Sequence, residues 1–263
     1  VGNLRHQLKA TVMYYGPTPM AELEKLISKT MPRKKNIGKF AYEAHPYKQV
    51  ETNEPKVLIA PYDAKNIYMI QYYNENIGWN PEHAAIIELF NNYFGGGMSG
   101  IVFQELREAR GLAYSAFASY DEAWRKTAKE QFYTYIITQN DKMIDCVKEF
   151  NTLLDSMPQR EATFANSKQY VMKNIASRRV QKFSILSNYH WAQRMGLDYD
   201  INSRIYKEIP GITLQQLAKF ADERIARKPY TYIILGNEAD LDMKTISSYG
   251  KVKRVSLEEA FGY

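Results

Sequence analysis

The sequence predicts an α+β fold in which a mostly antiparallel sheet has helices packed on one face. Strand-like runs repeatedly end at a turn residue and are followed at once by an amphipathic helix. The string YTYII also occurs at residues 133–137 and again at 230–234, and each copy precedes three residues that end in Asn and then a helical pattern. Because an amphipathic helix has to bury its apolar stripe, such repeated units pack as helices against a sheet. Typical sheet sizes give about five or six strands.

Four strand–helix units follow one another along the chain. ATVMYYGP leads into TPMAELEKLISK, NIYMIQYYNENIG into WNPEHAAIIELFNNYF, QFYTYIITQN into DKMIDCVKEFNTLLDSM, and PYTYIILGN into EADLDMKTISSYG. Thr18, Asn140 and Asn237 stand at junctions where a side-chain oxygen can accept a hydrogen bond from the free amides of a helix N-terminus. We therefore expect these three residues to be N-caps.

A helical block separates the two YTYII copies. Residues 161–179 and 183–197 each predict one helix, and 213–227 predict a third that starts at a Thr cap and ends in basic residues. The stretch 31–55 is polar and contains proline, which is typical of a connection between folded elements. We expect it to join an N-terminal strand–helix unit to the main body.

Charge and composition exclude several classes of protein. The net charge of +6 is spread along the chain, and local basic clusters are limited to PRKKN, SRRVQK and KVKR. No nucleic-acid recognition motif accompanies these clusters, so we expect them to be solvated surface. The single cysteine, Cys146, excludes a disulfide scaffold and a cysteine-rich zinc site. The apolar runs are too short for a membrane span. The cellular compartment stays open, with the bacterial periplasm and the cytoplasm as the two expectations.

Three consecutive glycines, Gly95, Gly96 and Gly97, follow a helix predicted over residues 81–94. A P-loop needs a lysine after its last glycine, and a dinucleotide-binding turn follows a strand, so neither phosphate-binding motif is present. A nucleophile elbow is also excluded, because Ser99 lacks the spaced glycines. The glycines are instead predicted to end the helix and reverse the chain, with Ser99 capping the next helix.

Metal-binding motifs are absent from the sequence. The histidines His6, His45, His83 and His190 are scattered and form neither H-E-x-x-H nor H-x-x-E-H. His83 and Glu88 are five residues apart, which places them on different faces of a helix. We therefore expect no zinc site built by this chain alone.

The segment FQELREARGLAYS predicts a helix that ends at Gly111 and a strand over residues 112–120. Arg107 falls in the last helical turn and Tyr114 at the start of the strand, so a helix-to-strand corner can bring the two side chains together. On spacing alone, the simpler interpretation is that Arg107 pairs with carboxylates of its own helix and Tyr114 packs in the sheet.

The stretch YFGGGMSGIVFQELREARGLAYSAFASY resembles the second homologous half of pitrilysin/insulinase-family zinc peptidases, which include mitochondrial processing peptidase. A glycine cluster, LRE-x-RGLAY and a strand pair follow in family order, and the resemblance extends over almost the whole chain. It implies a processing-peptidase/LuxS-like metallohydrolase fold. It also implies that residues 1–30 are the terminal strand–helix unit of a preceding domain, 31–55 a linker, and 56–263 the C-terminal peptidase-like αβ domain.

The resemblance further implies roles for single residues. The family's zinc is held in the other half by H-x-x-E-H and a downstream Glu, so zinc is expected in a partner half and no cofactor in this chain. Arg107 and Tyr114 match an Arg and a Tyr of the family's second half that reach the substrate. The Tyr is thought to donate to the scissile carbonyl as its oxyanion develops, and the Arg to position the substrate. Gly95, Gly96 and Gly97 are weaker candidates for substrate binding, because the family's substrate-capturing loop is longer.

Three functional hypotheses follow. In the first, the chain is the non-metal half of a zinc metalloendopeptidase that acts on peptides. A zinc-binding half of the same polypeptide, or of a partner subunit, completes the site, and the isolated chain is inactive. In the second, it is a catalytically inactive scaffold or interaction module of the same family. The third is an unrelated α+β binding module, which requires that Arg107 and Tyr114 lie apart. No nucleic-acid partner is expected.

Overall fold

The computed structural model describes residues 11–31 and 49–261. The chain divides into two compact units. The described residues of one are 11–31 and 179–196, and those of the other are 49–178 and 197–261. The first unit contains helix α1 (Met20–Thr30) and helix α6 (Lys182–Met195). Residues 11–17, where a strand is predicted, form none. A strand needs a neighbour to accept its hydrogen bonds, and none of the described residues pairs with this segment.

The second unit is built on one six-stranded sheet with the order β3-β4-β2-β5-β1-β6. Three of its strand pairings are antiparallel, and the two that involve β1 are parallel. The predicted sheet is therefore present, with a parallel edge that the sequence did not predict. The strand bounds are β1 Lys56–Pro61, β2 Asn66–Tyr73, β3 Ser115–Asp121, β4 Gln131–Gln139, β5 Thr231–Gly236 and β6 Lys251–Arg254.

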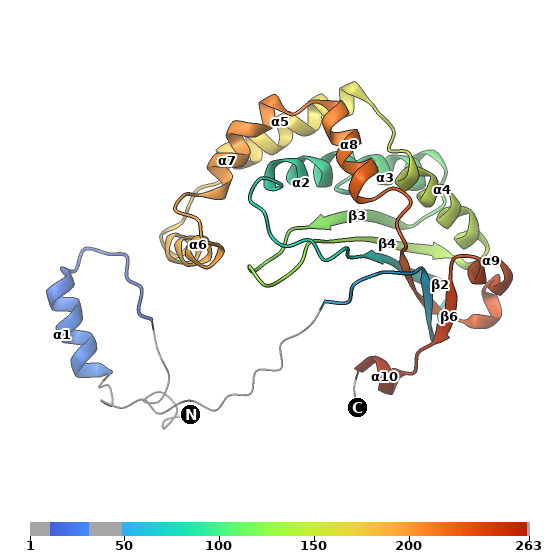
Figure 1. Cartoon of the computed structure of the whole chain (residues 1–263), viewed down its shortest axis with the longest axis horizontal. Coiled ribbons are helices and arrows are strands. Elements are labelled where there is room, and N and C mark those ends of the chain that lie inside the picture. Colours follow the sequence, from blue (N-terminus) through green and yellow to red (C-terminus); the bar gives the residue numbers. More distant parts are fainter. Residues whose placement is uncertain (1–10, 32–48, 262–263) are drawn as a thin grey trace. The chain divides into compact units, whose positions relative to one another are not determined.

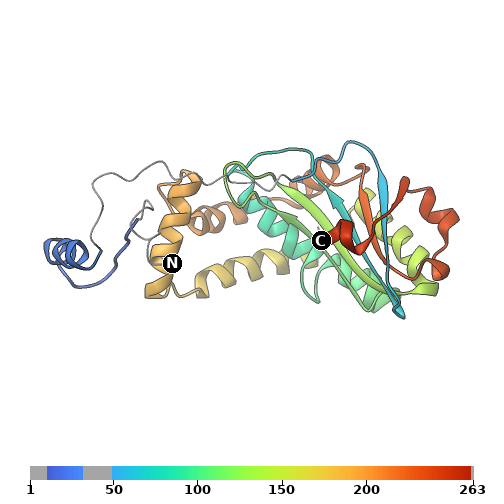
Figure 2. The same cartoon turned by 90° about the horizontal axis from the view of Figure 1, so that it is seen from below.

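Helices of this unit cover one face of the sheet, as predicted (Figure 1), and Figure 2 views the same unit from below. The α-helices are α2 Ala84–Phe90, α3 Ile101–Phe103, α4 Met143–Asp155, α5 Glu161–Ser177, α7 Ile201–Glu208, α8 Leu214–Arg224, α9 Met243–Ser247 and α10 Leu257–Phe261. Two segments are π-helical, η1 Asn91–Gly95 and η2 Gln104–Ala109, and three short ones are 3-10 helices, η3 Asn140–Lys142, η4 Ile209–Gly211 and η5 Glu238–Asp240. No helix of the described residues is long and apolar enough to cross a bilayer.

The helices start at some of the predicted caps and not at others. Thr213 forms a capping box with Gln216, and Asn237 accepts from the amide of Ala239. Asn140 does not cap, because Gln139 takes the N-cap position, and the side-chain amide of Asn140 donates to Asp240. Thr18 does not cap α1 either, since its hydroxyl accepts from the phenol of Tyr14 and Pro19 takes the N-cap position.

The core lies between the sheet and the helices, where alternate strand residues are buried. Phe132 on β4 meets Phe90 on α2 with ring centroids 6.4 Å apart, and Tyr120 on β3 meets Phe220 on α8 at 5.1 Å. Burying an aromatic side chain of this size is among the largest single contributions to a core. These contacts fix which face of each strand looks inward.

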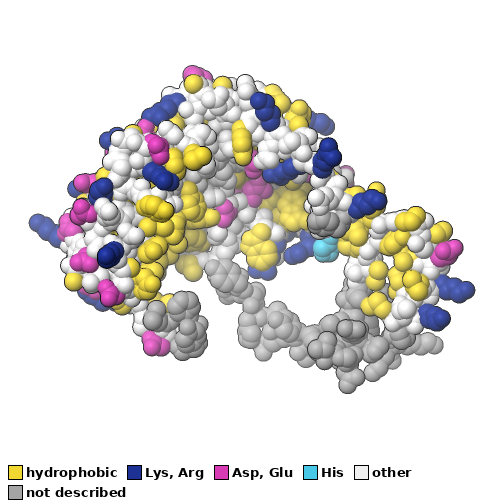
Figure 3. All heavy atoms as spheres, turned by 180° about the vertical axis from the view of Figure 1, so that it is seen from behind, with side chains coloured by type: hydrophobic (Ala, Val, Ile, Leu, Met, Phe, Trp, Pro, Cys, Tyr) yellow, Lys and Arg dark blue, Asp and Glu magenta, His cyan; other side chains and the backbone are white. Residues whose placement is uncertain are grey.

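The opposite face of the sheet is apolar as well, although no layer of helices from the described residues covers it (Figure 1). One row of side chains crosses five strands in register, and its members are all aromatic or aliphatic. In strand order the row is Phe117, Tyr135, Ile70, Ile233 and Leu58. The rings of Phe117 and Tyr135 lie 5.3 Å apart, and Ile233 is 38% exposed. Hydrophobic side chains also gather in a broad patch in the space-filling view (Figure 3).

Candidate functional site

The glycine cluster is a tightly packed chain reversal. Helix α2 continues into the π-helix η1, which ends at Gly95. A Cβ atom on Gly95 would lie 1.8 Å from the carbonyl oxygen of Ala118 on β3, so only glycine fits there. Gly97 has a φ of 70°, a left-handed conformation that suits the predicted chain reversal. Ser99 is not the cap of the next helix, since Gly100 takes that position without a side-chain hydrogen bond.

The three candidate glycines differ in accessibility. Gly95 is buried, whereas Gly96 and Gly97 line a depression of about 580 Å³ together with Met98 and Tyr170. The buried position of Gly95 gives it a packing role beneath β3. Only Gly96 and Gly97 are placed where a ligand could reach them.

The segment after the glycines is π-helical where an α-helix is predicted. Helix α3 ends at Phe103, and η2 continues from Gln104 to Ala109. Gly111 ends it with a φ of 57° and donates its amide to the carbonyl of Arg107 over 3.1 Å. Gly111 is therefore the predicted terminating glycine. A π-helical turn has a wider repeat than an α-helical one, and such turns are frequent at functional sites.

A hydrogen-bonded corner joins η2 to strand β3. The strand begins at Ser115, later than predicted, because the amides of Leu112 and Ala113 both donate to the carbonyl of Leu106. Thr138 on β4 donates its hydroxyl to the carbonyl of Leu112 over 2.6 Å. The amide of Tyr114 donates to Ile137 on the same strand over 2.9 Å. The backbone of the corner is thus fixed from both sides.

This corner brings Arg107 and Tyr114 together. The guanidinium carbon of Arg107 lies 5.6 Å from the ring centroid of Tyr114 and 5.0 Å from that of Phe103. Tyr114 is 73% exposed, so the interpretation that it packs in the sheet is wrong. The ion pair of Arg107 with a carboxylate of its own helix is weak, since its Nε lies 3.9 Å from Glu108 and both side chains are about half exposed. A cation and a phenol therefore face solvent side by side.

A second polar cluster lies at the other end of β3. His83 Nδ1 is 2.8 Å from Glu130, and the hydroxyl of Tyr120 donates to the same carboxylate over 3.0 Å. Burial first, and then the carboxylates of Glu130 and Glu88, raise the pKa of Glu122 to about 7. The sequence did not reveal this cluster, because His83 and Glu130 are 47 residues apart and follow no motif.

The described residues do not fit a metal ion. Within 11–31 and 49–261, no group of three His, Cys, Asp or Glu side chains is placed to hold one. His6 and His45 lie outside the described residues. Cys146 is buried on α4, and burial raises the pKa of its thiol to about 12, which makes it a packing residue.

Comparison with known proteins identifies a family whose sequence profile matches this chain. Residues 3–169 match the sequence profile of the peptidase M16 inactive domain, which is more than half of the chain. Over 68 residues the chain is 34% identical to zinc proteases of Mycobacterium bovis and Mycobacterium tuberculosis that are described as uncharacterised. That alignment spans 26% of this chain and 15% of each relative.

Solved structures share the fold at low sequence identity. The peptidase M16 inactive domain from Pseudomonas fluorescens superposes with a TM-score of 0.61 and 14% identity, over 82% of this chain and 50% of that one. A conserved protein from Enterococcus faecalis gives 0.65 and 17%, over 86% and 51%. Pitrilysin gives 0.57 and 13%, over 92% of this chain and 25% of its own length.

The family match and the juxtaposed Arg107 and Tyr114 exclude an unrelated α+β binding module. The chain spans about half the length of two of these structures and a quarter of pitrilysin. The profile, the mycobacterial relatives and the shared fold agree with one another. This chain therefore belongs to the peptidase M16 family and corresponds to its C-terminal, non-zinc half.

Proposed function

We propose that this chain is the non-metal half of a zinc metalloendopeptidase, and that it contributes substrate-binding and transition-state-stabilising side chains to a site completed elsewhere. The family match, the relatives named zinc proteases and the part-length coverage of the similar structures support this. The zinc belongs to a partner half, either of the same polypeptide or of a partner subunit. On this proposal residues 31–55 link a preceding domain to the peptidase-like domain at 56–263.

The observation that carries the proposal is the pairing of Arg107 with Tyr114. Both are donors near neutral pH, because a guanidinium is always charged and a phenol is protonated. Their side chains are exposed, and the guanidinium lies over the phenol ring. Donors held in place beforehand stabilise negative charge that develops in a transition state, because no reorganisation is needed at that moment.

We assign Tyr114 and Arg107 distinct roles toward a peptide substrate. The phenol of Tyr114 donates a hydrogen bond to the carbonyl oxygen of the scissile peptide, and this bond strengthens as the oxygen gains negative charge. The guanidinium of Arg107 donates to a neighbouring peptide carbonyl and orients the chain. Neither residue has to give up a proton for these roles.

The apolar open face of the sheet supports a peptide as the substrate class. The row from Phe117 to Leu58 ends at the β3 edge, and Tyr114 directly precedes that strand. An extended peptide laid against this face can bury apolar side chains while its backbone reaches the corner. The exposed Gly96 and Gly97 border a separate depression and are secondary candidates for contact with substrate.

The experiment measures peptide hydrolysis by the full-length protein, which contains both this chain and the zinc-binding half. Arg107→Ala and Tyr114→Phe should each lower the turnover number, while Tyr206→Phe, at an exposed tyrosine on α7, should not. The isolated chain should neither cleave peptides nor retain zinc. Parental activity in both the Arg107 and the Tyr114 variants would refute the proposed roles.

The scaffold function remains the alternative outcome of this experiment. If neither the other half nor a partner subunit has a zinc-binding motif, the full-length protein would bind no zinc for catalysis. It would then bind partners through the same open face without cleaving them. Peptide binding without hydrolysis in both parent and variants would indicate that function.

A further inference from the structure

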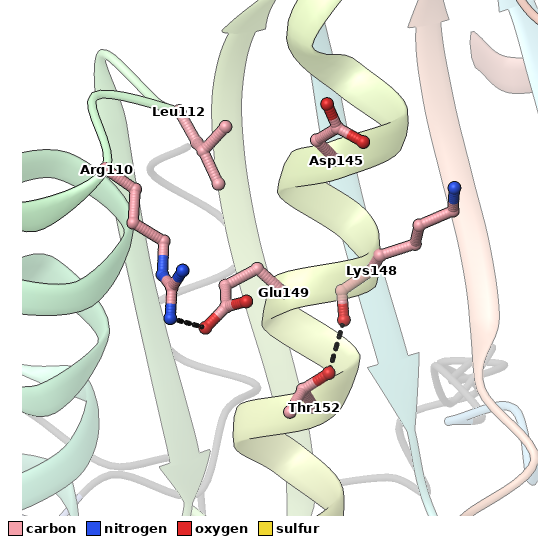
Figure 4. Close-up of a pocket in the computed structure, with 6 residues that line it drawn as sticks. All are labelled: Arg110, Leu112, Asp145, Lys148, Glu149 and Thr152. Atoms are coloured by element: carbon pink, nitrogen blue, oxygen red, sulfur yellow. Dashed lines mark hydrogen bonds and ion pairs between the residues drawn. The ribbon is translucent and has the colours of Figure 1, made fainter.

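Glu105 on η2 is the most buried carboxylate near the corner, with 13% of its side chain exposed. It forms an ion pair with Arg160, the N-cap residue of α5, and its other oxygen lies 3.8 Å from Nε of Arg110. Arg110 in turn binds Glu149 on α4 over 2.9 Å, and Figure 4 shows it reaching across from the end of the helix. Four alternating charges thus connect α5, η2 and α4.

The π-helical turn favours the approach of Arg110 to Glu105. Backbone hydrogen bonds in such a turn join residues five apart, and Glu105 and Arg110 have this spacing. Arg107 lies two residues from Glu105 and is directed instead toward the rings of Phe103 and Tyr114. Glu105 is therefore paired with Arg110 and Arg160, and the guanidinium of Arg107 stays available to bind a ligand.

The same network holds the corner in place. Lys142 donates its ammonium to the carbonyl of Gly111 over 3.0 Å, next to the Arg110–Glu149 pair. On the α5 side, Tyr93 donates to Pro158 and accepts from the amide of Arg160. The Arg160 end of the charge chain is thus anchored through its amide on the buried Tyr93, and Lys142 adds a separate hydrogen bond to the corner at Gly111.

We infer that Glu105 is a positioning residue for the site, which acts through Arg107. By binding Arg110 and Arg160 it holds η2 between α4 and α5, and it leaves the guanidinium of Arg107 directed to the corner. This inference rests on the proposed function of Arg107. It assigns Glu105 no contact with substrate.

The test is a double-mutant cycle in the full-length protein, with peptide hydrolysis measured as kcat and KM. Glu105→Gln removes the charge at nearly constant shape and should lower kcat/KM by about ten- to a hundredfold, as small misplacements of a substrate-positioning group do. In an Arg107→Ala background the same substitution should change kcat/KM less than twofold, because the residue it positions is gone. Glu208→Gln is the matched control, since it breaks an ion pair of 2.7 Å on α7.

Each outcome decides between the two claims. If Arg107→Ala keeps parental activity, the proposed function of Arg107 fails. If Arg107→Ala is impaired but Glu105→Gln is not, or if Glu105→Gln costs the same factor in both backgrounds, only the positioning role is overturned. Should Glu105→Gln unfold the protein, as a thermal scan would show, Glu149→Gln replaces it in the cycle. That substitution removes the outer partner of Arg110 and should lower kcat/KM in the same Arg107-dependent way.

Discussion

The two copies of YTYII lie in one sheet, on either side of β2, and yet turn opposite faces to the core. In β4 the tyrosine Tyr135 lies on the open face and Ile136 is fully buried. In the second copy, which ends in β5, Tyr232 and Ile234 are buried and Ile233 is 38% exposed. The same five letters therefore contribute aromatic surface in one place and aromatic core in the other.

The difference shows that a pentapeptide does not choose its own face. Side chains alternate with a period of two, so a shift of one residue exchanges the faces of a whole strand. The residue before each copy differs, with the fully buried Phe132 before the first and Pro229 before the second. Contacts with the helices also determine which face of the strand is buried, since Tyr232 receives a hydrogen bond from Asn151 on α4.

The largest expected effect contrasts the third residue of each copy. Tyr232→Ala should lower the free energy of unfolding by about 3–5 kcal/mol, because it empties a buried aromatic site. Tyr135→Ala should cost less than half of this, since its ring is partly solvated on the open face. Urea unfolding of both variants checks the contrast. Equal losses would mean that the open face is packed as tightly as the core.

A smaller effect on the free energy of unfolding depends on pH. It concerns the segment that precedes the first YTYII copy. The hairpin before the first copy contains Glu122, whose pKa is raised by burial, and then by Glu130 and Glu88, to about 7 from an ordinary 4.5. Between these two pH values the unfolded chain releases this proton while the folded chain keeps it. The free energy of unfolding should therefore fall as pH rises from about 4.5 to 7. Above pH 7 the contribution of Glu122 should stay constant, because its carboxyl is ionised in both states.

Glu122→Gln isolates this effect. The variant should unfold at a higher temperature than the parent at pH 8, and the difference should vanish near pH 4. Melting curves at several pH values, with Glu208→Gln as the control, measure it. A difference that is the same at all pH values would show that Glu122 is not the titrating group.

The smallest expected effect lies on the open face of the second copy. Ile233→Ser should change the free energy of unfolding by no more than about 1 kcal/mol, because the side chain is already partly in water. The neighbouring Ile234→Ser should cost several times more, since Ile234 is buried. Chemical unfolding of the pair tests the register of β5 directly. Reversed magnitudes would place the wrong residues on the open face.

Local sequence patterns predicted much of the fold and part of the site. The alternation in β2 and β4, the helices at 161–179 and 213–227 and the terminating Gly111 follow from periodicity and turn chemistry, and the structure contains them within a few residues. The corner that joins Arg107 to Tyr114 was predictable for the same reason. Helix α7 was missed, because its segment is short and mostly polar.

The features that escaped prediction depend on contacts between distant segments. The charged KVKR is mostly exposed, as expected, but it also forms the edge strand β6 by pairing with β1, which the sequence did not predict. The π-helical η2 has the composition of an ordinary α-helix, so nothing local predicts its wider turn. The pairing of Glu105 with Arg160 joins residues 55 apart. Charge patterns within one helix cannot reveal it.

The central claim is that Tyr114 stabilises negative charge on the substrate carbonyl, and Tyr114→Phe tests it most directly by removing a single oxygen atom. In the full-length protein this substitution should lower kcat for peptide hydrolysis by about 10²–10³, as the loss of one oxyanion donor does. KM should change little, because the hydrogen bond is strongest in the transition state. A parental kcat, or a loss confined to KM, would contradict the account.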